Sequence, residues 1–88
     1  MAKQEWRHKN ALVTGAGSGI GRALSKELAR RGATVYVSAL TEFEAQRVVE
    51  EIAAQGDSAV AVELDVTDNA QYLAAIERVA SEQGAIDL

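Results

Sequence analysis

The sequence predicts an α/β fold in which a doubly wound parallel sheet is built in the order β-α-β-α-β-α. Three observations predict it. The hydrophobic pattern alternates along the chain between short apolar runs and longer helical patterns. The connections between these segments are only a few residues long, which favours parallel strands joined by right-handed crossovers with helices packed on the sheet. A turn rich in glycine also separates the first strand from the first helix.

The first three elements follow from local pattern. The first strand is expected over residues 10–14, an apolar run that a glycine closes. The first helix is expected to begin at Gly19 and to stop at Gly32, because glycine favours a helix end. Its apolar face comprises Ile20, Ala23, Leu24 and Leu28. Residues 33–38 (ATVYVS) are rich in β-branched and aromatic side chains, which predicts the second strand.

A capping box predicts where the second helix begins. Thr41 is followed three residues later by Glu44, and such a pair satisfies free backbone donors at a helix start. Gly56 is expected to end this helix. Its apolar face comprises Ala45, Val48, Val49, Ile52 and Ala53. Residues 59–64 (AVAVEL) predict the third strand.

The last helix has signals at both ends. Asp68 with Gln71 predicts its capped start, and Gly84 predicts its stop. Its inward face is expected to comprise Leu73, Ile76, Val79 and Ala80. Residues 86–88 are similar to the opening of a fourth strand. With no proline to form a rigid linker and no internal repeat, residues 1–88 are expected to belong to a single domain.

Composition excludes several classes of protein and site. The absence of cysteine excludes disulfides, thiolate zinc sites and a cysteine nucleophile, and a single histidine excludes any metal site that needs two imidazoles. Hydrophobic residues make up 48% of the chain, but no run approaches the roughly 20 apolar residues of a membrane helix, and residues 1–10 lack a signal-peptide core. A net charge of −4 argues against nucleic acid as a partner. We therefore expect a cytoplasmic protein with no membrane partner.

Residues 15–21 hold four glycines in seven positions, between the first strand and the first helix. Glycine in such a turn lets the backbone approach a pyrophosphate, and the following helix offers free N–H groups. A strict G-x-G-x-x-G pattern fails because Ile20 and Leu24 occupy the place of the third glycine, and no Walker A lysine is present. The pattern that fits is G-x-x-x-G-x-G. A turn that merely needs glycine for tight geometry remains the alternative.

Written as TGAGSGIG, this turn resembles the cofactor loop of the short-chain dehydrogenase/reductase family. Other stretches match the family's landmarks in order: ALVTG before the loop, GRAL after it, and the segments 64–67 (LDVT) and 86–88 (IDL). The resemblance spans residues 10–88. It implies a Rossmann-like sheet of strand order 3-2-1 whose fourth strand is missing, and it implies that residues 1–88 are the N-terminal part of a dinucleotide-binding domain.

The resemblance also assigns roles to individual residues. It implies that five residues of the turn wrap the pyrophosphate and adenosine ribose, namely Gly15, Ser18, Gly19, Ile20 and Gly21. It implies further that Asp65 faces the adenine amino group, with the Val66 backbone beside it. The alternative for Asp65 is that it only helps to cap the next helix. Arg22 is expected to be a solvated helix residue rather than a phosphate contact.

Preference between NAD and NADP depends on the end of the second strand, where a carboxylate favours NAD and a nearby arginine favours NADP. That place holds Ala39 and Leu40, and the loop position where NADP-using relatives often carry a base is Ser18. Neutral hydrogen bonds could come from Ser38 and Thr41. Glu42 and Glu44 add unfavourable charge for a phosphate. The cofactor is therefore expected to be NADP or NAD, with a slight lean to NADP.

No catalytic residue is expected within this chain. The family's serine and Tyr-x-x-x-Lys group lie beyond the equivalent of Leu88, and four residues after Tyr36 and Tyr72 stand Leu40 and Ile76 instead of lysine. We expect the N-terminal part of a longer homo-oligomeric enzyme that transfers hydride between a nicotinamide cofactor and an alcohol or carbonyl substrate. The alternatives are a non-catalytic dinucleotide-binding module and a self-associating fragment.

Overall fold

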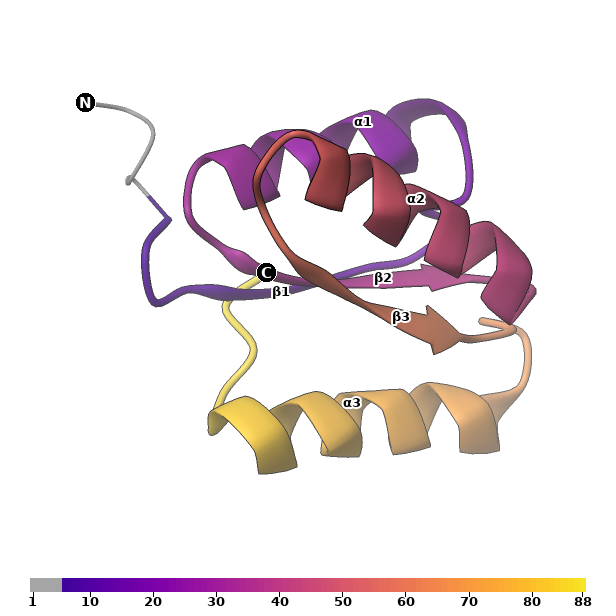
Figure 1. The fold of residues 1–88 in the computed structure, drawn as a ribbon. Coiled ribbons are helices and arrows are strands. Elements are labelled where there is room, and N and C mark those ends of the chain that lie inside the picture. The colour runs from indigo at the N-terminus through magenta and orange to yellow at the C-terminus, as the bar shows by residue number, and fades with distance from the viewer. Residues whose placement is uncertain (1–5) are drawn as a thin grey trace.

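The structure is a computed structural model, and it describes residues 6–88. Residues 1–5 lie outside the described residues. They are the first half of residues 1–10, the segment that is predicted to lack a signal-peptide core. The described chain forms a parallel three-stranded sheet with helices on both of its faces (Figure 1). The predicted α/β class and element order are confirmed.

The sheet contains β1 (Asn10–Val13), β2 (Thr34–Ala39) and β3 (Ala59–Glu63), with β2 in the centre. The order β1-β2-β3 is the predicted order 3-2-1 counted from the opposite edge. Strand ends differ from the prediction by one residue, because pairing with a neighbour rather than local propensity decides where a ladder stops. As the central strand, β2 is buried along almost its whole length.

Two helices cover one face of the sheet and one covers the other (Figure 1). The first face carries α1 (Gly19–Arg30) and α2 (Glu42–Ala54), and the second carries α3 (Asn69–Gln83). Alternation along β2 divides the core in the same way, since Val35 and Val37 belong to the cluster under α1 and α2 while Tyr36 belongs to the cluster under α3.

The predicted caps of α2 and α3 are confirmed. The backbone N–H of Glu44 donates to Thr41 Oγ1 at 3.2 Å, and Thr41 Oγ1 in turn donates to Glu44 Oε1 at 3.1 Å. Asp68 Oδ1 accepts from the N–H groups of Ala70 and Gln71. Gly84 ends α3 in the left-handed region, with φ 88°. Local hydrogen bonds of this kind therefore set both ends of α3.

The end of the chain lies along the free edge of β1. The N–H of Leu12 donates to the Leu88 carbonyl at 2.8 Å, and the N–H of Asp87 donates to the Asn10 carbonyl at 2.7 Å. Asp87 Oδ2 accepts from the Asn10 N–H at 2.8 Å. Residues 86–88 thus make backbone hydrogen bonds where a fourth strand is expected, although they are not themselves a β-strand. The edge of β1 is partly paired.

The predicted apolar faces of α1 and α3 are only partly buried. Leu28 lies in the core, but Ile20 is 86% exposed and Leu24 is 42% exposed; Ser25 and Ala29 are buried instead. In α3, Val79 is buried while Leu73 is largely exposed. These side chains stay exposed because the sheet has only three strands, so each helix contacts it through a narrow stripe of side chains. The exposed side of α1 extends past the edge of β1 that faces away from β2. A groove of about 380 Å³ lies there, and its lining comprises Leu12, Val13, Thr14, Ile20, Gly21, Leu24 and Leu88.

Among the described residues, none of the helices has the combination of length and apolar character needed to cross a bilayer.

Candidate functional site

The turn between β1 and α1 folds back tightly against the first turn of the helix. A Cβ added to Gly21 would lie 2.4 Å from the carbonyl oxygen of Gly15 and 3.1 Å from the Cα of Ala16. Real Cβ atoms do not approach backbone so closely, so only glycine fits at position 21. This contact brings the start of the turn and the start of α1 together.

Gly15 and Gly19 meet a different requirement. Both have left-handed backbone conformations, with φ 62° and 60°, which side chains with a Cβ rarely adopt. A Cβ added to either residue would meet no atom within 4 Å. The outer side of the turn is therefore open, and a ligand can approach its backbone directly.

The amino end of α1 lacks the side-chain cap that the other two helices have. Ser18 occupies the N-cap position but its hydroxyl makes no cap hydrogen bond, whereas Thr41 and Asp68 cap α2 and α3. The first-turn N–H groups of a helix have no partner within the helix, and they carry the positive end of its dipole. Free donors at an open glycine turn form a suitable site for an anionic oxygen.

Ser38 anchors the turn to the sheet. Its buried hydroxyl donates to the carbonyl of Val13 at 2.8 Å, and its own carbonyl accepts from the N–H of Ala16 at 2.8 Å. The expectation that Ser38 could donate to a ribose is therefore wrong, because its hydroxyl is buried and bonded within the protein. No local signal in the sequence identifies this role, since the partners lie 25 residues apart.

The end of β2 places Ala39 against the glycine turn. Its side chain is 4% exposed and lies in the core, whereas the next residue, Leu40, is exposed. A Cβ added to Gly17 would lie 3.4 Å from the Ala39 Cβ and 3.5 Å from Glu44 Oε2. The Glu44 carboxylate therefore lies beside the turn and the strand end, closer than the sequence alone predicts.

Asp65 follows β3 and is held by Thr67. Its Oδ1 accepts from the Thr67 hydroxyl at 2.6 Å and from the Thr67 N–H at 2.9 Å. These two hydrogen bonds lower the pKa of the Asp65 carboxyl below its usual value, so it is ionised at neutral pH. Asp68 makes the side-chain cap bonds of α3. The Asp65 carbonyl accepts from the Asp68 N–H and the Asp65 N–H donates to Gln71 Oε1, so the alternative that Asp65 helps to support this helix start remains. Val66 beside it is half exposed.

Arg22 lies close to the turn but is engaged elsewhere. Its Nε and Nη2 donate to the two carboxylate oxygens of Glu51 on α2, both at 2.7 Å. The guanidinium lowers the pKa of the Glu51 carboxyl, and the carboxylate raises the pKa of Arg22. The pair joins α1 to α2 on the solvent side. This agrees with the expectation that Arg22 is a surface residue of the helix.

The predicted site residues gather at one edge of the sheet. The glycine turn, Ala39 and the Asp65–Val66 pair follow β1, β2 and β3 respectively, and the carboxyl ends of parallel strands share an edge. The N–H of Leu64 donates to the Ala39 carbonyl at 2.8 Å, which ties the second and third segments together. The topology therefore brings together all three groups that the sequence predicts.

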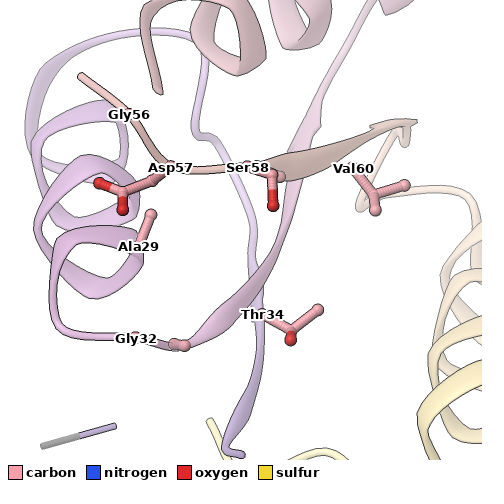
Figure 2. A pocket seen from close by; sticks show the side chains of 9 residues that line it. Ala29, Gly32, Thr34, Gly56, Asp57, Ser58 and Val60 are labelled. Atoms are coloured by element: carbon pink, nitrogen blue, oxygen red, sulfur yellow. The ribbon is translucent and has the colours of Figure 1, made fainter. Parts of the chain in front are cut away.

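A larger hollow of about 420 Å³ lies at the opposite edge, before β2 and β3 begin (Figure 2). Figure 2 shows the side chains of Thr34, Asp57 and Ser58 at this hollow, together with Gly32 and Gly56. None of the predicted site residues lines it. This hollow and the predicted site are therefore separate places on this domain.

Comparison with known proteins gives the family directly. A family model described as short chain dehydrogenase matches residues 9–88. The short-chain dehydrogenase/reductase homolog YusS of Bacillus subtilis (strain 168) is 42% identical over 82 residues, which cover 92% of this chain and 75% of YusS. Other curated relatives are matched over a smaller share, such as 33% of the 3-oxoacyl-[acyl-carrier-protein] reductase FabG of Staphylococcus aureus (strain Mu50 / ATCC 700699).

Solved structures agree with this assignment. A 7α-hydroxysteroid dehydrogenase complexed with NADH and 7-oxo glycochenodeoxycholic acid has a TM-score of 0.86 and 35% identity, covering 93% of this chain and 32% of that one. A metagenomic short-chain oxidoreductase in complex with NADP has a TM-score of 0.88 and 30% identity, covering 93% and 37%. The chain therefore spans about a third of these structures. Its motifs, its fold and these matches together show that the chain belongs to the short-chain dehydrogenase/reductase family.

Proposed function

We propose that this chain binds the adenosine and pyrophosphate of a nicotinamide dinucleotide, NADP or NAD, at the carboxyl edge of its sheet. The observation that carries the proposal is the open, uncapped amino end of α1 behind a turn whose Gly19 has φ 60°. Backbone donors with no side chain in front of them suit a pyrophosphate. The solved relatives that hold NADH and NADP support the same class of ligand.

Each predicted residue has a defined part in this proposal. The pyrophosphate and adenosine ribose would lie against the turn residues Gly15, Ser18, Gly19, Ile20 and Gly21. Asp65, ionised because of its bonds to Thr67, would accept a hydrogen bond from the adenine amino group, with the Val66 backbone beside the ring. Ala39 would line the ribose end of the site. The residues present therefore fit this half of a dinucleotide.

We further propose that the chain contributes this half to an oxidoreductase acting on an alcohol or carbonyl substrate. When bound, the nicotinamide supplies or accepts the hydride. The family's phenol and lysine are not a pair in residues 1–88, so the residues here bind and orient rather than transfer protons. Assembly as a homo-oligomer belongs to the same proposal. A second candidate is a dinucleotide-binding module that acts without catalysis, because residues 1–88 contain the glycine turn but no Tyr-x-x-x-Lys pair.

The test is calorimetric titration of the chain with NAD⁺ and NADP⁺, comparing the wild type with Gly19→Val. Valine at position 19 places a branched side chain in the open space in front of the α1 donors. Gly56→Val is the matched control, because Gly56 also has a left-handed φ, of 94°, with open space at its Cβ, yet it lies at the opposite edge of the sheet. Both variants carry comparable backbone strain of about 1–2 kcal/mol.

We expect Gly19→Val to lose at least about tenfold in affinity for both nucleotides, while Gly56→Val keeps the wild-type affinity. Far-UV circular dichroism establishes that both variants are folded. A folded Gly19→Val chain with unchanged affinity would contradict the proposed site.

A further inference from the structure

Glu44 lies where two segments of the candidate site meet, the glycine turn and the end of β2. Its Oε2 would be 3.5 Å from a Cβ on Gly17 in the glycine turn, and its own Cβ would be 3.3 Å from that atom. The same Gly17 position is 3.4 Å from the Ala39 Cβ at the end of β2. A carboxylate carried by α2 thus reaches the junction of the turn and the strand end.

The position of this carboxylate is held by the helix start. Thr41 Oγ1 donates to Glu44 Oε1 at 3.1 Å and accepts from the Glu44 N–H at 3.2 Å. Glu44 is partly buried, which agrees with a side chain that lies against the turn. The bond to Oε1 leaves Oε2 available on the side of the turn.

Among the described residues, no cation pairs with the Glu44 carboxylate. Within residues 6–88 the ion pairs engage Glu27, Glu51 and Glu82, and no lysine or arginine lies within ion-pair distance of Glu44. In the described part of the chain, the Glu44 carboxylate is therefore left without a paired cation at this corner of the site.

The two hydroxyls beside the end of β2 do not compete with it. The Ser38 hydroxyl is buried against the Val13 carbonyl, and the Thr41 hydroxyl is used by Glu44 itself. A side chain that accepts a hydrogen bond from a ribose hydroxyl favours NAD, whereas a 2′-phosphate needs a cation. Of these groups, only the Glu44 carboxylate remains to act on the ribose.

We propose that Glu44 is the residue that determines nucleotide preference in this chain, by accepting a hydrogen bond from the adenosine ribose and repelling a 2′-phosphate, so that NAD is preferred over NADP. This inference rests on the proposed function. It reverses the slight lean to NADP that the sequence favours, because Ala39 is neutral but the carboxylate from α2 occupies the same corner. The preference comes from the first turn of the helix rather than from the strand end.

The experiment compares affinities for NAD⁺ and NADP⁺ in the wild type, Glu44→Gln and Glu42→Gln. Glutamine at position 44 keeps the size and the oxygen that Thr41 bonds, and removes only the charge. Glu42→Gln is the matched control, since it removes the same charge from an exposed residue of the same helix turn. Calorimetry measures each affinity, and circular dichroism establishes the fold.

We expect the wild type to prefer NAD⁺, and we expect Glu44→Gln to raise NADP⁺ affinity relative to NAD⁺ about tenfold. Glu42→Gln should change the ratio by less than about twofold, because its charge is solvated and screened. A wild type that prefers NADP⁺, or a Glu44→Gln variant with an unchanged ratio, would overturn the inference while leaving the proposed function intact. Failure of the wild type to bind either nucleotide would overturn the proposed function itself.

A second measurement needs no variant. Salt screens the repulsion between a carboxylate and a 2′-phosphate, so the wild-type affinity for NADP⁺ relative to NAD⁺ should rise between about 0.05 M and 0.5 M sodium chloride. A ratio that stays constant or falls over this range would overturn the inference, including in the case where Glu44→Gln does not fold.

Discussion

Gly21 packs against the carbonyl oxygen of Gly15, and a Cβ at position 21 would lie 2.4 Å from that oxygen. The contact joins the first residue of the glycine turn to the first turn of α1. Both partners belong to backbone that is held in place, because the Ala16 N–H is bonded to the Ser38 carbonyl. A side chain at position 21 therefore cannot be accommodated by a small shift.

Gly21→Ala should destabilise the fold by at least about 2 kcal/mol. Alanine is favoured over glycine in helices by about 1 kcal/mol, but overlap with fixed backbone costs more than that gain. Urea unfolding followed by circular dichroism measures the change. Gly56→Ala should cost only its left-handed strain, about 1 kcal/mol, since its Cβ would meet no atom within 4 Å. Equal stabilities of the two variants would contradict the close contact.

The amino ends of α1 and α3 predict that Ser18→Ala and Asp68→Ala change the free energy of unfolding by different amounts. Asp68→Ala should cost about 1 kcal/mol, because Asp68 Oδ1 accepts from two N–H groups of α3. Ser18→Ala should cost less than about 0.3 kcal/mol, although serine is usually a good N-cap, because the Ser18 hydroxyl makes no cap bond. Thermal or urea unfolding of both variants tests this. A cost at Ser18 as large as that at Asp68 would mean that its hydroxyl caps α1 in solution.

Tyr36 should lose its proton at a higher pH than an ordinary tyrosine, and the free energy of unfolding should therefore fall at high pH. Its buried phenol donates to Glu82 Oε1, and burial first, then this carboxylate, raises the pKa of Tyr36 above its usual value near 10. The folded state therefore prefers the protonated phenol. The stability that this preference contributes is fully present below pH 10 or so and is lost as pH rises through the raised pKa.

Absorbance of the phenolate near 295 nm, followed from about pH 8 to pH 12, measures this titration. Tyr36→Phe should lack the late step, and its free energy of unfolding should fall less steeply with pH above about 10. If the wild type and Tyr36→Phe lose stability in parallel over this range, Tyr36 is not the group responsible.

Much of the fold could be predicted because its signals are local. The cap bonds of Thr41 and Asp68 lie within three residues of the side chains that make them, and Gly84 stops α3 through its own backbone conformation. The grouping of the glycine turn with Asp65 also follows from sequence, since parallel strands place their carboxyl ends at one edge. The motif and the element order therefore suffice to predict both the family and the region of the site.

The apolar periodicity of α1 overestimates what is buried. Apolar periodicity predicts which side of a helix can be buried. Whether that side is buried depends on which strands lie beneath it. Ile20 and Leu24 lie beyond the edge of β1 that faces away from β2 and remain exposed, whereas Leu28 is buried in the core. The pairing of residues 86–88 with β1 likewise depends on two segments more than 70 residues apart in sequence.

The sequence by itself determined the succession of strands and helices, their caps and the glycine turn, because each depends on bonds and backbone angles within a few residues. Only the tertiary structure decided that Ser38 braces the turn and that Glu44 reaches Gly17. Those contacts join residues that lie 22 to 27 positions apart in sequence, so they follow from strand register and helix packing. A charged residue that is distant in sequence can therefore lie beside the proposed site, and a hydroxyl that the sequence leaves available can be hydrogen-bonded within the fold.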